Sequence, residues 1–276
     1  LAAVMGEHGE TGPVIGVAFD GTGYGADGCI WGAEFLAADL TGYRRLAHLR
    51  YVPLPGGDLA ARRPWRVALG YTALDRSARR SLASAFDGVP PAELALAERQ
   101  LEAGVNAPMA SSMGRLFDAA AAIIGVRRVS HYEGQAAMEL EALAGKRIAA
   151  EFPMEISPDG QGGWEINPLP LLSRLGHRAA RGDDPADLAA DFHASVAWMT
   201  ETVVRRAADA TGLTTVALGG GTFQNARLLE SVERRLIGHG FRVLVPRCLS
   251  PNDGAVSYGQ AVVAAAVSDQ LSAVSH

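Results

Sequence analysis

The chain has 276 residues, 48% of them apolar, which suffices for the core of one large domain or two small ones. Its 25 basic and 30 acidic residues give a net charge of −5, without the basic footprint of a nucleic-acid-binding domain. The sequence has only two cysteines, Cys29 and Cys248, and no CxxC motif. It shows no signal peptide, and no apolar run approaches the about 18 residues that a membrane span needs. We therefore expect a reduced, cytoplasmic protein without a membrane partner.

The first fifty residues predict three strands, at about 13–20, 29–37 and 43–50, because short runs rich in Val, Ile, Tyr, Phe and Trp are bounded by Gly, Asp and Thr. Between the first two stands FDGTGYGADG, residues 19–28. Its four glycines let the backbone approach a ligand and adopt positive φ.

Exposed amides in such a turn form an anion-binding concavity, and Asp20 at the strand end can address a metal or a water. We therefore predict a phosphate-binding hairpin, with Gly21, Thr22 and Gly23 beside the phosphate. The alternative is an ordinary hairpin whose glycines serve only the turn.

Residues 55–182 are predicted to be mainly helical. The candidate helices cover 59–72, 92–103, 112–125 and 133–144. Two strand-like pieces, 147–156 and 163–167, follow and are joined by a turn at 157–160. The charged segment 178–184 suggests a boundary or an exposed loop.

The last third predicts a long helix followed by β-α-β-α. Asp184 is a good N-cap with Pro185 at the first helical position. A buried helix face is indicated by helical spacing of Phe192, Val196, Met199 and Val203. The remaining elements are expected at 214–218 (strand), 223–239 (helix), 241–245 (strand) and 253–267 (helix).

Three antiparallel strands followed by two right-handed β-α crossovers give a mixed sheet with helices on its faces. We therefore predict an α/β fold of ribonuclease-H-like topology, βββαβα, with a large, mainly helical insertion. Its divisions are 1–54 for the three strands, 55–182 for the insertion and 183–276 for the βαβα completion.

Two further clusters resemble ligand loops. Gly219, Gly220 and Gly221 stand where a strand ends and a helix begins, and Asn225 lies in the first helical turn. Asp253 enters the last helix. A tight βα turn and a helix cap are the bland alternatives. Because Asp20, the glycines and Asp253 all flank core strands, one cleft could gather them, and its two carboxylates could hold a cation beside a phosphate.

The insertion adds Arg115 and Asp118, spaced i, i+3 near a helix start, and Glu133 with Gln135 at another. Arg115 can neutralise a phosphate and a carboxylate can accept from ribose hydroxyls. An ordinary surface ion pair and helix capping are the alternatives. Six histidines show no paired spacing and are interpreted as structural or exposed: His8, His48, His177, His193, His239 and His276.

Five motifs in order resemble one family: VAFDGTGYGADGCIWGAEF, SSMGRLFD, YEGQAAMELE, LGGGTFQN and PNDGAVSYGQA. They are similar to the C-terminal part of the HypF hydrogenase-maturation carbamoyltransferases, over about residues 1–268. The resemblance implies the actin-like ATPase fold, in the branch shared with tRNA threonylcarbamoyl transferases and antibiotic O-carbamoyltransferases. The chain would form the second lobe of the transferase domain.

The resemblance also implies a chemistry. HypF-like enzymes make carbamoyl adenylate from carbamoyl phosphate and ATP, and pass the carbamoyl group to the C-terminal cysteine of a partner, HypE. The resulting thiocarboxamide becomes a cyanide ligand of the [NiFe] centre. Their divalent metal, for which Fe, Zn and Mg are candidates, is held by two histidines and carboxylates. Asp20 and Asp253 match the carboxylates, and the histidines would precede this chain.

By the same resemblance, the Gly219–Gly221 run and Asn225 would border the adenosine, and Arg115, Asp118 and Glu133 would address phosphate or ribose. Ala33 and Ala255 stand where the family commonly has a second glycine. Without the histidines and the first lobe, we expect the isolated chain to bind adenine nucleotides weakly at best and not to catalyse transfer. An O-carbamoyltransferase and a non-catalytic nucleotide-binding lobe are the rival interpretations.

Overall fold

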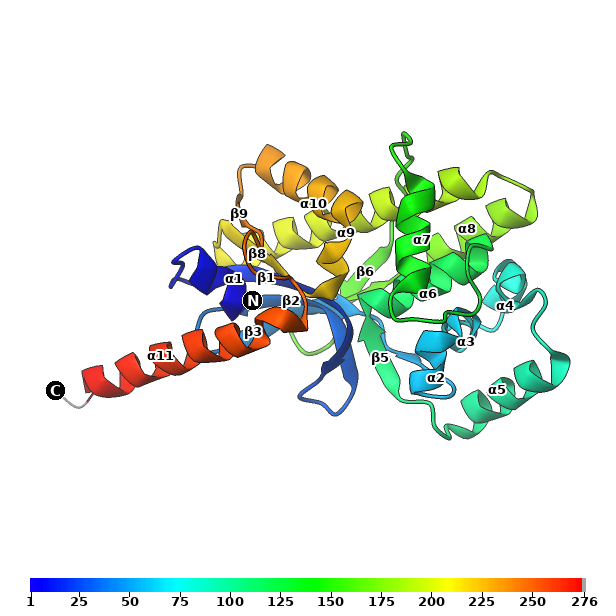
Figure 1. Cartoon of the computed structure of the whole chain (residues 1–276), viewed down its shortest axis with the longest axis horizontal. Helices are drawn as coiled ribbons and strands as arrows, with labels where there is room; N and C mark the ends of the chain where they lie inside the picture. The colour runs from blue at the N-terminus through cyan, green and yellow to red at the C-terminus, as the bar shows by residue number, and fades with distance from the viewer. Residues whose placement is uncertain (275–276) are drawn as a thin grey trace.

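The computed structural model describes residues 1–274, and the side chains of residues 1–269. Its frame is one mixed sheet of order β6-β7-β3-β2-β1-β8-β9 (Figure 1). β1 (Val14–Tyr24) and β3 (Tyr43–Leu49) each pair antiparallel with β2 (Ile30–Ala38), so the three predicted strands are present. β8 (Thr215–Gly219) pairs parallel with β1, and β9 (Arg242–Leu244) with β8. The predicted ribonuclease-H-like order is therefore confirmed.

The insertion is not only helical, since it adds strands to the same sheet. β5 (Met109–Ser112) pairs parallel with the start of β2, and β4 (Val52–Pro53) pairs antiparallel with β5. β6 (Glu155–Pro158) and β7 (Trp164–Asn167) form a hairpin, and β7 pairs parallel with β3, so the hairpin widens the sheet. β5 has only four residues, too few to show strand periodicity, and the sequence analysis missed it.

The predicted strand at 147–156 is mostly wrong, because only its end belongs to β6. The N–H groups of Ala150 and Phe152 donate instead to Asp191 Oδ1 (2.6 Å) and Ser195 Oγ (2.9 Å) of α9. These amides are therefore satisfied by helix side chains and not by a neighbouring strand.

The long helix α9 (Pro185–Thr211) begins as predicted. Asp184 caps it by accepting from the Ala186 N–H at 2.9 Å, and Pro185 is its first residue. The predicted face Phe192, Val196, Met199 and Val203 is buried in the main core. α10 (Ala226–Gly238) and α7 (Gln135–Ala144) pack on α9, on the upper side of Figure 1.

The helix predicted at 59–72 is broken into α2 (Asp58–Arg62) and α3 (Pro64–Tyr71). Pro64 forces Arg63 out of the helical region, to φ −130° and ψ 73°. α5 (Pro91–Ala103) and α6 (Met113–Ile124) lie where expected. The sequence analysis missed four helical elements: α1 (Ala2–Glu7), α4 (Ala78–Ser81), the 3₁₀ helix η1 (Ala83–Phe86) and α8 (Leu169–Ala180).

α8 enters the segment 178–184 that was predicted to be a boundary or loop, so the loop is shorter than expected. The final helix α11 (Val256–Val274) packs against α1 and extends away from the body in Figure 1. Within residues 1–274, no helix combines the length and apolar character needed to cross a bilayer.

Candidate nucleotide-binding site

The glycine-rich run forms a bulge within β1, where the sequence predicted a turn. β1 pairs regularly with β2 up to Phe19 and again from Gly23, and the intervening residues 20–22 stand opposite Gly32. A Cβ on Gly32 would lie 2.6 Å from the Asp20 carbonyl oxygen, so the bulge needs a glycine opposite it. β1 ends at Tyr24, four residues later than the predicted end of the strand, and the turn begins at Gly25.

The start of α6 holds this bulge in place. The Ser112 hydroxyl lies 2.6 Å from the Gly21 carbonyl oxygen and 3.1 Å from that of Asp20, and it also accepts from the Arg115 N–H as the helix N-cap. A Cβ on Gly114 would stand 2.8 Å from the Gly21 Cα. A serine cap followed by a glycine therefore lets the helix press directly on the bulge.

The Asp20 carboxylate accepts hydrogen bonds from nearby backbone amides. Its Oδ1 accepts from the Gly21 N–H at 2.8 Å, and the Gly221 N–H also bonds to it. Burial raises the pKa of Asp20; the two amide bonds oppose this rise, whereas the negative charges of Asp253 and Glu133 add to it. Three acidic side chains from distant segments thus converge. Of the amides predicted to lie open for a phosphate, that of Gly21 is bound by this carboxylate, as is that of Gly221.

The second glycine cluster is pressed against β1. Gly220 has φ +101°, and a Cβ there would stand 2.2 Å from the Phe19 carbonyl oxygen. Its N–H donates to the Pro251 carbonyl at 3.0 Å. At Gly220 the absent side chain therefore makes room for the β1 backbone. At Gly221 the nearest neighbour of a Cβ would be Asp20 Oδ1, at 3.2 Å.

A cavity of about 530 Å³ opens where the pairing of β1 with β8 stops, at Ala18 and Gly219. Asp20, Gly219, Gly220 and Asp253 line it, so the three sequence clusters do meet at one site. α1 and α11 form its apolar walls with residues such as Val4 and Val263. Its volume is in the range of small-molecule sites, about 300–1,000 Å³.

The cap before the last helix is Asn252 and not Asp253. Asn252 Oδ1 accepts from the Gly254 N–H at 3.0 Å and from the Ser250 hydroxyl at 2.7 Å. Asp253 follows this cap as the first residue of the 3₁₀ helix η3 (Asp253–Ala255), and it is exposed at the cavity.

Arg115 and Asp118 form a buried pair behind the bulge, and the surface-pair alternative is wrong. Arg115 Nε lies 3.0 Å from Asp118 Oδ2. Burial raises the pKa of Asp118 to about 6, although the guanidinium opposes the rise. Arg115 Nη2 would stand 3.6 Å from a Cβ on Gly21, so the cation reaches the bulge. Neither residue lines the cavity.

Asn225 is buried, and both ends of its amide are engaged. Its Oδ1 accepts from the Leu228 N–H at 2.9 Å, which caps α10, and its Nδ2 lies 2.9 Å from His193 Nε2. Because His193 Nδ1 lies 2.7 Å from the Ala189 carbonyl oxygen and must donate to it, Nε2 is the acceptor. Burial lowers the pKa of His193 to about 4, so the ring is neutral, as suits a structural histidine.

Glu133 is exposed two residues before α7, whose N-cap is Gly134. The capping alternative is therefore wrong for Glu133, and its charge acts on Asp20. The Gln135 amide instead links the His131 N–H to Glu139 Oε1, at 2.8 Å and 2.9 Å.

The metal implied by the family resemblance finds only part of a ligand set. Within the residues that the structure describes, no group of three or more His, Cys, Asp or Glu side chains could hold a metal ion. Asp20 and Asp253 face one cavity, but protein metal sites usually take about four or more donors. These residues alone therefore do not fit a complete metal centre.

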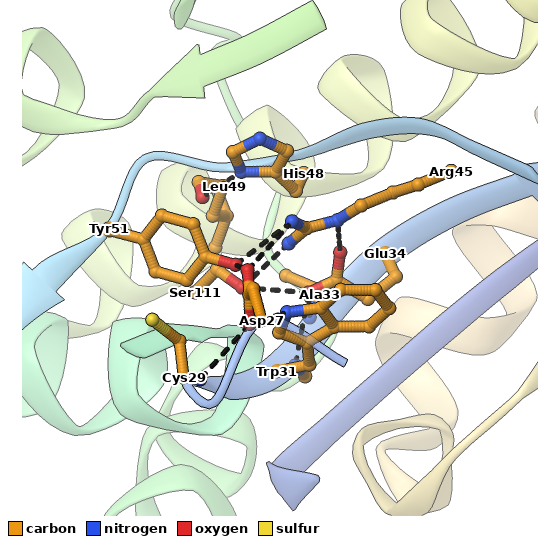
Figure 2. Close-up of polar contacts among 11 residues, drawn as sticks. Asp27, Cys29, Trp31, Ala33, Glu34, Arg45, His48, Leu49, Tyr51 and Ser111 are labelled. Atoms are coloured by element: carbon orange, nitrogen blue, oxygen red, sulfur yellow. Dashed lines mark hydrogen bonds and ion pairs between the residues drawn. The ribbon is translucent and has the colours of Figure 1, made fainter. Parts of the chain in front are cut away.

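A polar network that the sequence analysis missed fastens the hairpin beyond the bulge (Figure 2). At its centre is Arg45, whose Nε donates to Glu34 Oε2 at 2.6 Å and whose Nη1 donates to the Tyr51 hydroxyl at 2.9 Å. Tyr51 donates in turn to Asp27 at 2.5 Å. Asp27 also accepts from Trp31 Nε1 at 2.9 Å, and the Arg45 guanidinium stands 4.0 Å from the Trp31 ring centroid.

The network connects the hairpin tip to the bulge. Ser111 donates to Glu34 Oε1 at 2.7 Å, and the next residue, Ser112, bonds the bulge. Glu34 is only 3% exposed. A carboxylate in an otherwise apolar strand was the signal that a buried partner had to exist.

Comparison with known proteins decides the family. The sequence model of the family described as "Carbamoyltransferase, Kae1-like Domain, second subdomain" matches residues 16–260. The chain belongs to this Kae1-like carbamoyltransferase family. It is 41% identical to carbamoyltransferase HypF2 of Cupriavidus necator over 96% of this chain and 35% of that protein. A HypF homolog from the same organism is 42% identical over 96% of this chain and 68% of that protein.

A crystal structure of full-length HypF "in the phosphate- and nucleotide-bound form" matches this Kae1-like chain with a TM-score of 0.91 and 39% identity. The match covers 96% of this chain and 34% of that one. The resemblance to HypF and the predicted fold class are thereby confirmed. The chain spans about a third of the length of HypF2.

Proposed function

We propose that this chain is the part of a HypF-type carbamoyltransferase that binds carbamoyl adenylate, made from carbamoyl phosphate and ATP. The observation that carries the proposal is the cavity at the end of the β1–β8 pairing, where Asp20, Asp253, Gly219 and Gly220 meet. This edge of an α/β sheet is where such folds bind ligands. The nucleotide-bound state named for the HypF structure supports the same assignment.

The charge of the cavity restricts how an anionic ligand enters it. Asp20, Asp253 and Glu133 repel a phosphate. The pKa of Asp20, which burial raises, is raised further by the negative charges of Asp253 and Glu133. A divalent cation bound together with the nucleotide would relieve this repulsion. We propose Asp20 and Asp253 as the carboxylates that this chain offers to such a cation.

We further propose that the acceptor is the C-terminal cysteine of HypE. Its sulfur would bond to the carbamoyl carbon while the bond between that carbon and the phosphate oxygen breaks, releasing AMP, and the thiol proton would pass to solvent. The resulting thiocarboxamide would supply the cyanide ligand. The five motifs shared with HypF support this acceptor over the hydroxyl of an O-carbamoyltransferase.

The test uses the full-length protein that contains this chain. It is incubated with carbamoyl phosphate, ATP and HypE, and the mass of the HypE C-terminal peptide is measured. We expect Asp20→Asn and Asp253→Ala to lower adduct formation about 100-fold or more, as for loss of one strong electrostatic contact. Asp209→Asn, an exposed change on α9, is the matched control and should leave the rate unchanged. Wild-type rates in both site variants would contradict the assignment.

The incomplete ligand set favours one second candidate, a nucleotide-binding lobe without catalysis of its own. The purified chain in the same assay should bind nucleotide weakly and form no adduct. Adduct formation at the full-length rate would show that this chain alone suffices.

A further inference from the structure

Two of the parallel strand pairs, β1 with β8 and β3 with β7, have their carboxyl ends on the same side of the sheet. β1 and β3 are both antiparallel to β2, so they run in the same direction. β8 is parallel to β1, and β7 is parallel to β3. The cavity of about 530 Å³ that we propose to bind nucleotide, called the nucleotide cavity from here on, lies beyond the β1–β8 pair. In open α/β sheets, ligands bind beyond the carboxyl ends of parallel strands, so the end of the second pair is an equivalent location.

A second cavity, of about 520 Å³, lies at that location. Arg50, which directly follows β3, and Asn167, the last residue of β7, both line it. Its other walls are α4 and α8. A further hollow of about 370 Å³ continues along α8 and shares Pro170, Ser173 and His177 with it. We call the two together the basic groove.

The lining of the basic groove is opposite in charge to that of the nucleotide cavity. Its basic side chains are Arg50, Arg80, Arg174, His177, Arg178 and Arg181. Among the described residues, Asp75 is the one acidic residue that lines it, and its carboxylate accepts from the N–H and hydroxyl of Ser77. Such a concentration of basic groups is unusual for a chain of net charge −5.

Several of these cations have partners elsewhere. Arg178 pairs with Asp183 and Asp191, Arg50 lies 3.1 Å from Glu165, and Arg174 covers the Phe152 ring. Arg80 and Arg181, in contrast, form no ion pair with any residue in the described part of the chain, and both are exposed. These two guanidinium groups, Arg80 in the larger cavity and Arg181 in the adjoining hollow, remain to bind an anion.

The groove also has a fixed floor. Ser81 Oγ lies 2.9 Å from the Ala78 carbonyl oxygen and 3.1 Å from Ser173 Oγ where α4 meets α8. Because the Ser81 proton is engaged within the protein, the Ser173 hydroxyl is the one that can donate to a ligand. A Cβ on Gly176 would stand 2.0 Å from the Ser81 carbonyl oxygen, so the glycine lets the two helices touch. Guanidinium and hydroxyl donors together suit phosphate oxygens.

We propose that the basic groove binds a small phosphate-bearing anion, separately from the nucleotide cavity. Its chemistry is that of a phosphate monoester or inorganic phosphate. The main cavity has the volume of a small-molecule site, which favours the monoester.

The first test maps binding on the ¹⁵N-labelled chain by NMR. Inorganic phosphate and glycerol 3-phosphate are titrated separately, with sodium chloride keeping the ionic strength constant. We expect saturable amide shifts at Ser77, Ser81 and Ser173, with the monoester binding more tightly. Tighter binding of inorganic phosphate would assign the groove to the free ion. Shifts confined to Gly21 and Gly220, or equal shifts with chloride, would overturn the proposal.

The second test uses the double variant Arg80→Gln and Arg181→Gln. Its affinity for glycerol 3-phosphate should fall about tenfold or more, because charge-assisted hydrogen bonds are lost. Arg76→Gln is the matched control, since Arg76 is exposed in the same segment but lies outside the groove. All three positions are exposed, so folding should be retained. Equal affinity in the double variant and the control would overturn the proposal.

Discussion

The nucleotide cavity and the basic groove occupy the same edge of one sheet, yet they are built differently. The cavity is shaped by backbone: Gly220 touches Phe19, Gly32 touches Asp20, and its charged lining is acidic. The groove is shaped by side chains that α4 and α8 present, and its lining is basic. We therefore propose that the carboxyl ends of parallel strands determine where ligands bind in this fold, whereas the surrounding segments determine the charge of those ligands.

The largest effect should follow a change in the backbone contacts of the nucleotide cavity. Gly220→Val should lower the free energy of unfolding by about 3 kcal/mol or more, because its Cβ meets the Phe19 backbone and its φ is +101°. Urea unfolding measures this loss. Gly219→Ala is the control, since the nearest neighbour of its Cβ lies 3.6 Å away. Equal stability of the two variants would contradict the backbone-built description.

The next largest effect is a dependence of stability on pH, and it belongs to the region of the nucleotide cavity. The buried carboxyl of Asp118 lies behind the bulge that borders this cavity, and its pKa is raised. The pKa of this carboxyl is raised to about 6 from the ordinary 3.8, so the folded state keeps its proton longer than the unfolded state. Its contribution is fully present below about pH 4 and is lost as the pH rises through 6, a change of about 3 kcal/mol.

Asp118→Asn removes this titration. The stability of the variant relative to wild type should therefore rise by about 3 kcal/mol between about pH 4 and pH 6, measured by urea unfolding at each pH. Asp209→Asn, on the exposed face of α9, should show no such trend. A pH-independent difference between Asp118→Asn and wild type would disprove the raised pKa.

A smaller effect is expected at Asn225, which supports the loop between β8 and α10. Asn225→Asp keeps an oxygen for the Leu228 N–H but places a carboxylate beside His193 Nε2. The negative charge favours imidazolium, so the pKa of His193 should rise from about 4 by about one unit or more. NMR titration of the His193 ring measures the shift. An unchanged pKa would show that the Asn225–His193 bond does not form.

The smallest effects should separate two neighbours at the cavity. Asn252→Ala removes the cap and should cost about 0.5–2 kcal/mol of stability. Asp253→Ala, at an exposed position, should change stability by less than about 0.5 kcal/mol. Thermal unfolding compares them. A larger loss at Asp253 would mean that its role in the cavity is structural.

Features encoded by neighbouring residues could be predicted from the sequence. Asp184 and Pro185 predicted the start of α9. The alternation of short apolar runs and glycines predicted β1 to β3. The gathering of Asp20 and Asp253 also followed, because the strand order places both at one edge of the sheet.

Features that depend on distant partners could not be predicted. The amides of Ala150 and Phe152 are taken by α9 side chains, which no local pattern reveals. The network of Asp27, Arg45 and Ser111 and the basic groove likewise combine residues from several segments. Their chemistry exists only after the chain has folded.

The central strand has a further consequence during synthesis. β1 acquires β2 on one side almost at once, but its partner on the other side, β8, emerges roughly 200 residues later, because Ile15 pairs with Val216. At typical translation speeds that delay is about 10–40 s. For that time, an apolar strand presents an open edge of N–H and C=O groups to other chains. Nascent chains are thus vulnerable to edge-to-edge aggregation until β8 is made.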